Sequence, residues 1–137
     1  NAVYSIARQL LASGQLDLTT ADLWIMLVDG YSPDVENHNV VVDVAASEIT
    51  GSGYTRQQMT NPVVTRDSIN DRMVYKADSV SWPLANFEAD GAILFVNTGN
   101  DSTSTLVAFF GFGGTKRSQN TPFQILWSDD EGIINLR

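Results

Sequence analysis

The chain of 137 residues contains no cysteine and only one histidine. Without cysteine it can form neither disulfide bonds nor thiolate metal sites. A histidine-rich metal site or a Ser-His-Asp triad would have to rely on His38 alone. This residue lies between two asparagines in a polar stretch, where we expect a solvated side chain rather than a catalytic base.

Positive charge and long apolar runs are also scarce. Eight Lys and Arg residues stand against sixteen Asp and Glu residues, which gives a formal net charge of -8, and the basic residues are scattered along the chain. Direct binding to nucleic acid requires a concentrated basic surface, so the sequence predicts none. No apolar run approaches the roughly 20 residues of a membrane-spanning helix, so no contact with a membrane is expected either.

Two glycines one residue apart interrupt a strand-like run and are followed by an aromatic residue. Gly51 and Gly53 lack the third glycine of a dinucleotide-binding loop, because Arg56 stands at that position and no helical pattern follows. Glycine favours positive φ and allows close approach of the backbone. We therefore predict a sharp structural turn, in which Gly51 and Gly53 relieve the backbone and Tyr54 anchors the next strand.

Two further clusters have the composition of a phosphate-binding loop or a catalytic site but lack the residue order or surroundings that such a site needs. Residues 111–116 lack the Gly-Lys-Ser/Thr order of a phosphate-binding loop, and we expect an ordinary hairpin turn there. Three adjacent acids at 129–131 precede Gly132, which is typical of a solvated turn. Nothing in the sequence places these acids beside an apolar pocket that would raise a carboxyl pKa. We therefore predict no catalytic residue, no metal site and no enzyme activity.

The hydrophobic pattern changes once along the chain. Apolar residues recur at three- and four-residue spacing in residues 2–12, which predicts a short amphipathic helix in an N-terminal arm of residues 1–13. Short runs rich in β-branched and aromatic residues follow, separated by polar turns. This order predicts one all-β domain over residues 1–137, a jelly-roll-like antiparallel β-sandwich with one short N-terminal α-helix. The expected strands are residues 23–28, 40–45, 63–66, 72–76, 79–82, 92–97, 105–112, 123–127 and 133–136.

Three of these runs, at residues 23–28, 93–96 and 106–110, are apolar on both faces. A sheet with one solvated face would alternate apolar and polar residues, so something must cover the second face. Sandwich corners and the helix could account for all of it, but the helix is short, and we expect other subunits to cover part of these strands. Candidate interface residues are Val3, Ile6, Leu10, Trp24, Met26, Leu94, Val107 and Phe109.

A series of short motifs runs along nearly the whole chain. It comprises LLASG at residues 10–14, LDLT at 16–19, LWIMLV at 23–28, YSPD at 31–34, EITGSGYT at 48–55, ADSVSW at 77–82, NTGN at 97–100, and FQILW at 123–127 followed by Gly132 and Ile133. In order and spacing the series resembles the small virion structural proteins of tailed double-stranded DNA bacteriophages.

The resemblance implies a cement or decoration protein on the outer capsid surface, with no enzyme activity and no cofactor. Its expected partners are the phage major capsid protein and further copies of itself, as a homodimer or homotrimer. Its expected role is to bridge capsid subunits and stabilise the DNA-filled shell. The alternative is a tail- or fibre-associated virion protein that binds carbohydrate during host attachment, with exposed aromatics such as Tyr31 or Tyr54 as stacking platforms.

Overall fold

The computed structural model describes residues 1–128 and 132–136. In chain order the elements are β1 (Ala2–Val3), α1 (Ser5–Ala12), β2 (Leu23–Val28), η1 (Val41–Asp43), η2 (Ala45–Ser47), β3 (Gln57–Gln58), β4 (Val63–Asp67), β5 (Arg72–Lys76), β6 (Val80–Val96), β7 (Leu106–Ile125) and β8 (Ile134–Leu136).

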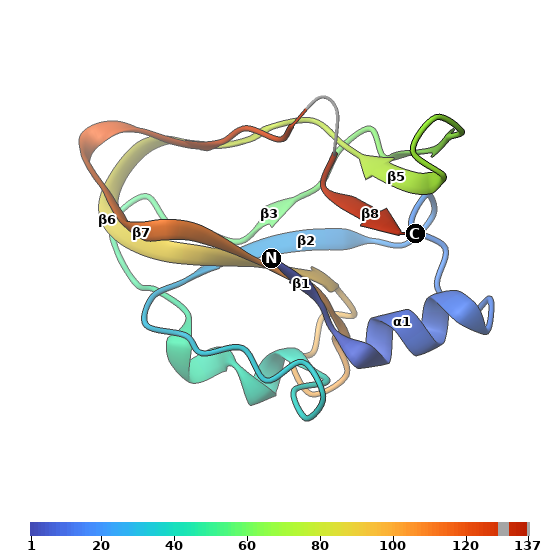
Figure 1. Cartoon of the computed structure of the whole chain (residues 1–137). Coiled ribbons are helices and arrows are strands. Elements are labelled where there is room, and N and C mark those ends of the chain that lie inside the picture. The colour runs from blue at the N-terminus through green and yellow to red at the C-terminus, as the bar shows by residue number, and fades with distance from the viewer. Residues whose placement is uncertain (129–131, 137) are drawn as a thin grey trace.

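Antiparallel strands build two sheets (Figure 1). The larger sheet has the order β1-β7-β6-β2-β3, and the smaller has the order β4-β5-β8. Every pair in both sheets is antiparallel. The prediction of an all-β fold with one short helix near the N-terminus is therefore confirmed.

Strands β6 and β7 are longer than the sequence predicts. Residues 79–82 and 92–97 were expected as separate strands but belong almost entirely to β6, and residues 105–112 and 123–127 likewise join in β7. Breaks in the register replace the expected turns. One lies between Trp82 and Ala85 and accommodates Pro83, which cannot donate a ladder hydrogen bond. Another lies where β6 residues 89 and 91 pair with β7 residues 116 and 111, so the glycine cluster is a bulge within β7 rather than a hairpin turn.

The expected strand at residues 40–45 is wrong. Its β-branched residues favour a strand, but the chain forms the two 3-10 turns η1 and η2 instead. Val41 and Val44, three residues apart, are both buried, and this spacing matches a 3-10 turn rather than a strand. The backbone N–H groups of Val41 and Val42 donate to the carbonyls of Ser104 and Asp101, which replace a ladder partner.

Two apolar clusters occupy opposite faces of the larger sheet. Leu23, Ile25 and Leu27 of β2 lie in one cluster. The smaller sheet contributes residues to the same cluster, such as Tyr75 of β5. Met26, on the other face, lies in a second cluster with residues of β6, β7 and η1. Figure 1 shows the smaller sheet on one side of the larger sheet and the segment of residues 29–50 on the other. The chain therefore covers both faces of its own two-sided strands.

The N-terminal helix is shorter than expected and is held inside the chain. Residues 2 and 3 form β1, which pairs with Phe109 and Ala108 of β7, and α1 begins only at Ser5. The helix packs against β7 and buries Ala7 completely. No helix in the described part of the chain is long and apolar enough to cross a membrane.

Candidate functional site

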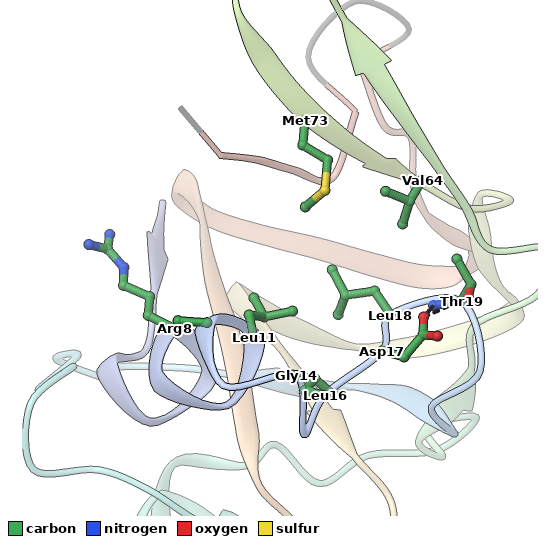
Figure 2. A pocket seen from close by; sticks show the side chains of 10 residues that line it. Arg8, Leu11, Gly14, Leu16, Asp17, Leu18, Thr19, Val64 and Met73 are labelled. Atoms are coloured by element: carbon green, nitrogen blue, oxygen red, sulfur yellow. Dashed lines mark hydrogen bonds between the residues drawn. The ribbon is translucent and has the colours of Figure 1, made fainter.

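A groove of about 930 Å³ lies between α1, the loop that follows it, and the β4–β5 hairpin. Met73 and Val64 on the hairpin face Leu11 and Leu18 across it (Figure 2). Ala12 and Leu16 extend the apolar lining. The volume and lining are of the kind that proteins use to hold apolar ligands or side chains.

A local hydrogen-bond cluster fixes the loop that forms one wall of this groove. The Asp17 carboxylate accepts hydrogen bonds from the backbone N–H of Thr19, at 2.9 Å, and from its hydroxyl, at 2.6 Å. These bonds lower the pKa of Asp17 below its ordinary value. With Asp17 engaged in this way, Leu18 is held in the core beneath the groove and only 3% exposed.

Two arginines lie beside the groove without an acidic partner. Arg8 lines it from α1. Arg66 shares a face of β4 with Val64 and pairs across the hairpin with Met73, which also lines the groove. Within residues 1–128 and 132–136, neither guanidinium makes a hydrogen bond or an ion pair. Positive charge without a partner is therefore concentrated beside this groove, in a chain whose net charge is -8.

A second, smaller hollow of about 410 Å³ lies along the C-terminal half of β7. Phe112, Pro122, Phe123 and Leu126 supply its apolar lining, and Leu126 is 71% exposed. Lys116 and Arg117 lie at its border. Strand β1 covers β7 only at residues 108 and 109, so beyond these residues no described strand pairs with the outer edge of β7.

The predicted turn at Gly51 and Gly53 is a corner of the chain that lies against β6. Ser52 forms an isolated bridge with Asn86. Gly53 has φ +86°, and a Cβ there would overlap the carbonyl oxygen of Leu84. The Tyr54 hydroxyl donates to Glu48 at 2.6 Å and accepts from the backbone N–H of Leu27 at 3.2 Å. The corner is thus fastened to both β2 and β6.

Arg56, three residues after Gly53, forms ion pairs with Glu48 and Asp101, and we call these three residues the clasp. Its guanidinium makes two hydrogen bonds to Glu48, each 2.8 Å long, and two to Asp101, at 2.8 and 3.1 Å. It also lies over the ring of Phe95, 5.4 Å from the centroid. The hydrogen bonds raise the pKa of Arg56 and lower that of Asp101. The clasp ties the corner to the loop between β6 and β7.

The structure corrects the predicted interface. Met26, Leu94 and Val107 are completely buried within the chain, so they cannot contact another subunit while the chain is folded. Val3, Ile6, Trp24 and Phe109 are partly buried against the chain's own two clusters, and Leu10 is half-buried on α1. The exposed large apolar side chains are different ones: Val42, Val63, Ile69, Leu84 and Leu126.

Neither proposed carbohydrate platform is an exposed ring. Tyr54 is packed between Trp82 and Phe87, with ring centroids 6.4 and 5.8 Å away. Tyr31 packs edge-on against Phe109 at 5.4 Å. Both rings are partly buried, so the surface that each offers for stacking on a sugar is reduced.

A chain of hydrogen bonds links residues 29–50, which cover one face of the larger sheet, to the buried Tyr4. The hydroxyls of Tyr4 and Tyr31 lie 2.8 Å apart, and the Tyr31 hydroxyl lies 2.8 Å from Nδ1 of His38. His38 is therefore hydrogen-bonded and half-buried rather than freely solvated. No three acidic or histidine side chains of the described residues gather closely enough to hold a metal ion. The acids at 129–131 lie outside the described residues.

Alkaline conditions are expected to unfold the protein, with all four tyrosines ionising together. Burial raises the pKa of Tyr75 to about 12 and also raises the pKa values of Tyr4, Tyr31 and Tyr54 above the ordinary value of 10.0. Because the unfolded state loses these protons first, the stabilisation is complete below about pH 10 and is lost as the pH rises toward the folded-state values.

Tyrosinate absorbance and circular dichroism, recorded over the same alkaline titration, measure this effect. The two signals should change over one pH interval, whereas the protein in concentrated urea should titrate near the ordinary tyrosine pKa. Ionisation of any tyrosine while the circular dichroism stays native would contradict the expectation.

Comparison with protein-family models, with curated proteins and with solved structures gives no match for this chain.

Proposed function

We propose that this chain is a non-catalytic structural subunit of a tailed-phage particle, a cement or decoration protein that binds the outer capsid surface and bridges major capsid subunits. The ordered motif series supports this proposal. Two of its motifs form structural features of the fold, namely β2 and the corner at Gly53. We also propose that the two sheets make a jelly-roll-like sandwich.

The observation that carries the proposal is the hollow along β7. An open strand edge presents backbone donors and acceptors to another chain. Beside this edge, Leu126 and Pro122 offer apolar surface that a neighbour can bury. Lys116 makes no ion pair within the described residues and favours an acidic segment on the shell. Many copies that each bridge two shell subunits would add their weak contacts together.

The two-sided strands give this proposal no support. The sequence pattern attributed their second face to other subunits, but residues 29–50 cover it. The motif series and the β7 hollow are the features that support a shell contact.

Particles that carry the chain provide the test. Quantitative mass spectrometry should find it at a copy number near that of the major capsid protein. Purified chain added to particles that lack it should restore this occupancy, and Leu126→Asp should lower the affinity for particles about tenfold or more, because a charge replaces the exposed apolar contact. Leu84→Asp, at a side chain that is 61% exposed and does not line the hollow, is the matched control.

A handful of copies per particle would overturn the shell role and favour the tail- or fibre-associated alternative. Equal losses of affinity for Leu126→Asp and Leu84→Asp would leave the shell role standing and overturn the β7 hollow as its contact surface.

A further inference from the structure

We propose that the tip of the β4–β5 hairpin of one copy docks in the groove between α1 and the β4–β5 hairpin of a second copy, with Ile69 as the inserted side chain. This self-association goes beyond the proposed function, because it requires no shell protein and uses a surface other than the β7 hollow.

The hairpin tip is a fixed apolar projection. Ile69 is 92% exposed, which is the largest exposed fraction among the big apolar side chains that the structure describes. The tip is the green loop next to the start of β5 in Figure 1. One exposed isoleucine alone would need no explanation. Its neighbours, however, fix the backbone of the turn that carries it.

Asp67 supplies that rigidity. Its carboxylate accepts hydrogen bonds from the backbone N–H groups of Ile69 and Asn70, both at 3.2 Å. It also accepts from the Asn70 side chain at 2.8 Å and from Nε of Arg72 at 3.0 Å. Since the turn is ordered before binding, docking of Ile69 loses little conformational entropy.

The groove matches the tip in polarity. Leu11, Leu16, Leu18 and Met73 provide an apolar lining on two opposing walls of a groove of about 930 Å³. Burial of an isoleucine side chain there removes apolar surface from water on both copies. A chain cannot fill its own groove with this tip, because residues of the same hairpin form one wall of the groove.

The groove and the tip carry unpaired charges of opposite sign, while the one acid that lines the groove, Asp17, is hydrogen-bonded to Thr19. Arg8 and Arg66 lie at the groove without acidic partners, and Asp71 lies beside Ile69 without a basic partner among residues 1–128 and 132–136. An acidic chain of net charge -8 would repel a second copy at most orientations. The docked orientation instead brings Asp71 to the arginines. Tip and groove wall belong to the same hairpin, so the contact either closes as a reciprocal two-fold dimer or repeats head-to-tail along a ring or open chain of copies.

The absence of cysteine allows a direct test. Ile69→Cys and Leu16→Cys are made as separate proteins, mixed and treated with a mild oxidant. The proposal predicts a disulfide-linked heterodimer of the two variants. Leu84→Cys mixed with Leu16→Cys is the matched control, because Leu84 is exposed but not on the hairpin tip. Equal cross-linking in the two mixtures would overturn the proposal.

Analytical ultracentrifugation of the unmodified chain gives an independent readout. The wild-type protein should self-associate, and Ile69→Asp should weaken the association about thirtyfold or more, with unchanged circular dichroism because the side chain is exposed. Arg8→Glu and Asp71→Lys should each weaken it, and the double variant should recover much of the loss. Leu126→Asp should have no effect. A wild-type protein that stays monomeric at every soluble concentration overturns this proposal, while its binding to particles would leave the proposed function intact.

Discussion

Replacement of Gly53 by alanine is expected to lower the free energy of unfolding by roughly 3 kcal/mol or more, enough to prevent stable folding of a marginal domain. Gly53 has φ +86°, which disfavours any residue with a Cβ. The added methyl group would also overlap the carbonyl oxygen of Leu84 and lie 3.4 Å from Cα of Ala85. These are backbone atoms of β6, so the sheet itself would have to move.

Gly99→Ala is the matched control for this experiment. Gly99 has nearly the same φ, +84°, but a Cβ there would meet no atom within 4 Å. Its substitution should cost only the backbone term, about 1 to 2 kcal/mol. Urea unfolding of both variants separates the steric contribution from the conformational one. Similar losses of stability at the two positions would show that contact with β6 is not what requires Gly53.

The second large effect is expected at Arg56. Its replacement by alanine should destabilise the protein by about 3 kcal/mol, because it removes the ion-pair partner of both Glu48 and Asp101 and leaves Glu48 with only the hydrogen bond from the Tyr54 hydroxyl. The side chains of Arg56 and Glu48 are only 26% and 17% exposed, so water replaces the lost bonds incompletely. The variant also loses the contact with the Phe95 ring.

Arg117→Ala tests whether burial is the cause. Arg117 pairs with Glu88 at the same distance, 2.8 Å, but the two side chains are 62% and 44% exposed. Its loss should cost less than about 1 kcal/mol. Arg56→Lys should fall between the two alanine variants, since lysine keeps the charge but cannot form the forked hydrogen bonds. An Arg117→Ala effect as large as that of Arg56→Ala in chemical unfolding would refute this ranking.

Local patterning predicts those elements of the fold whose surroundings are simple. Strands β2 and β5 have the predicted bounds. The dense apolar run of β2 and the turn residues that flank β5 each favour a strand over a helix or a turn. The helix pattern fails at its first turn. Val3 fits the apolar stripe of a helix, but β7, more than a hundred residues away, offers a strand partner and pulls residues 2 and 3 into the sheet.

Tertiary context also explains the other differences. Pro83 and the glycines at 111–114 are ordinary signals for the end of a strand, yet bulges accommodate them inside β6 and β7. The valines at 40–42 favour a strand, but they lie at a 3-10 turn, and Val41 packs against the second face of the larger sheet. A sequence pattern reports that a strand is apolar on both faces and does not report whether its own chain or another covers it.

The candidate sites were less accessible to sequence reasoning. The groove combines residues from α1, the next loop and a distant hairpin, so no local motif marks it. Ile69 did carry a signal, because it is an apolar residue between polar ones in a turn. The corner at Gly51, Gly53 and Tyr54 was visible because glycine spacing is a local property. Its attachment to Leu84 and Glu48 was not.

The strand order of the larger sheet also sets the order of events while the chain is synthesised. Strand β2 has β6 as its main partner, and β1 and α1 contact β7. Since β6 begins only at Val80, β2 leaves the ribosome well before this partner. Such long-range pairing is slow to form. During this interval the run Leu-Trp-Ile-Met-Leu-Val of β2, which has the composition of an aggregation-prone segment, has only the two-residue strand β3 as a possible partner in the larger sheet. Strand β2, which is almost wholly buried in the folded protein, is thus exposed on the nascent chain until β6 has been made.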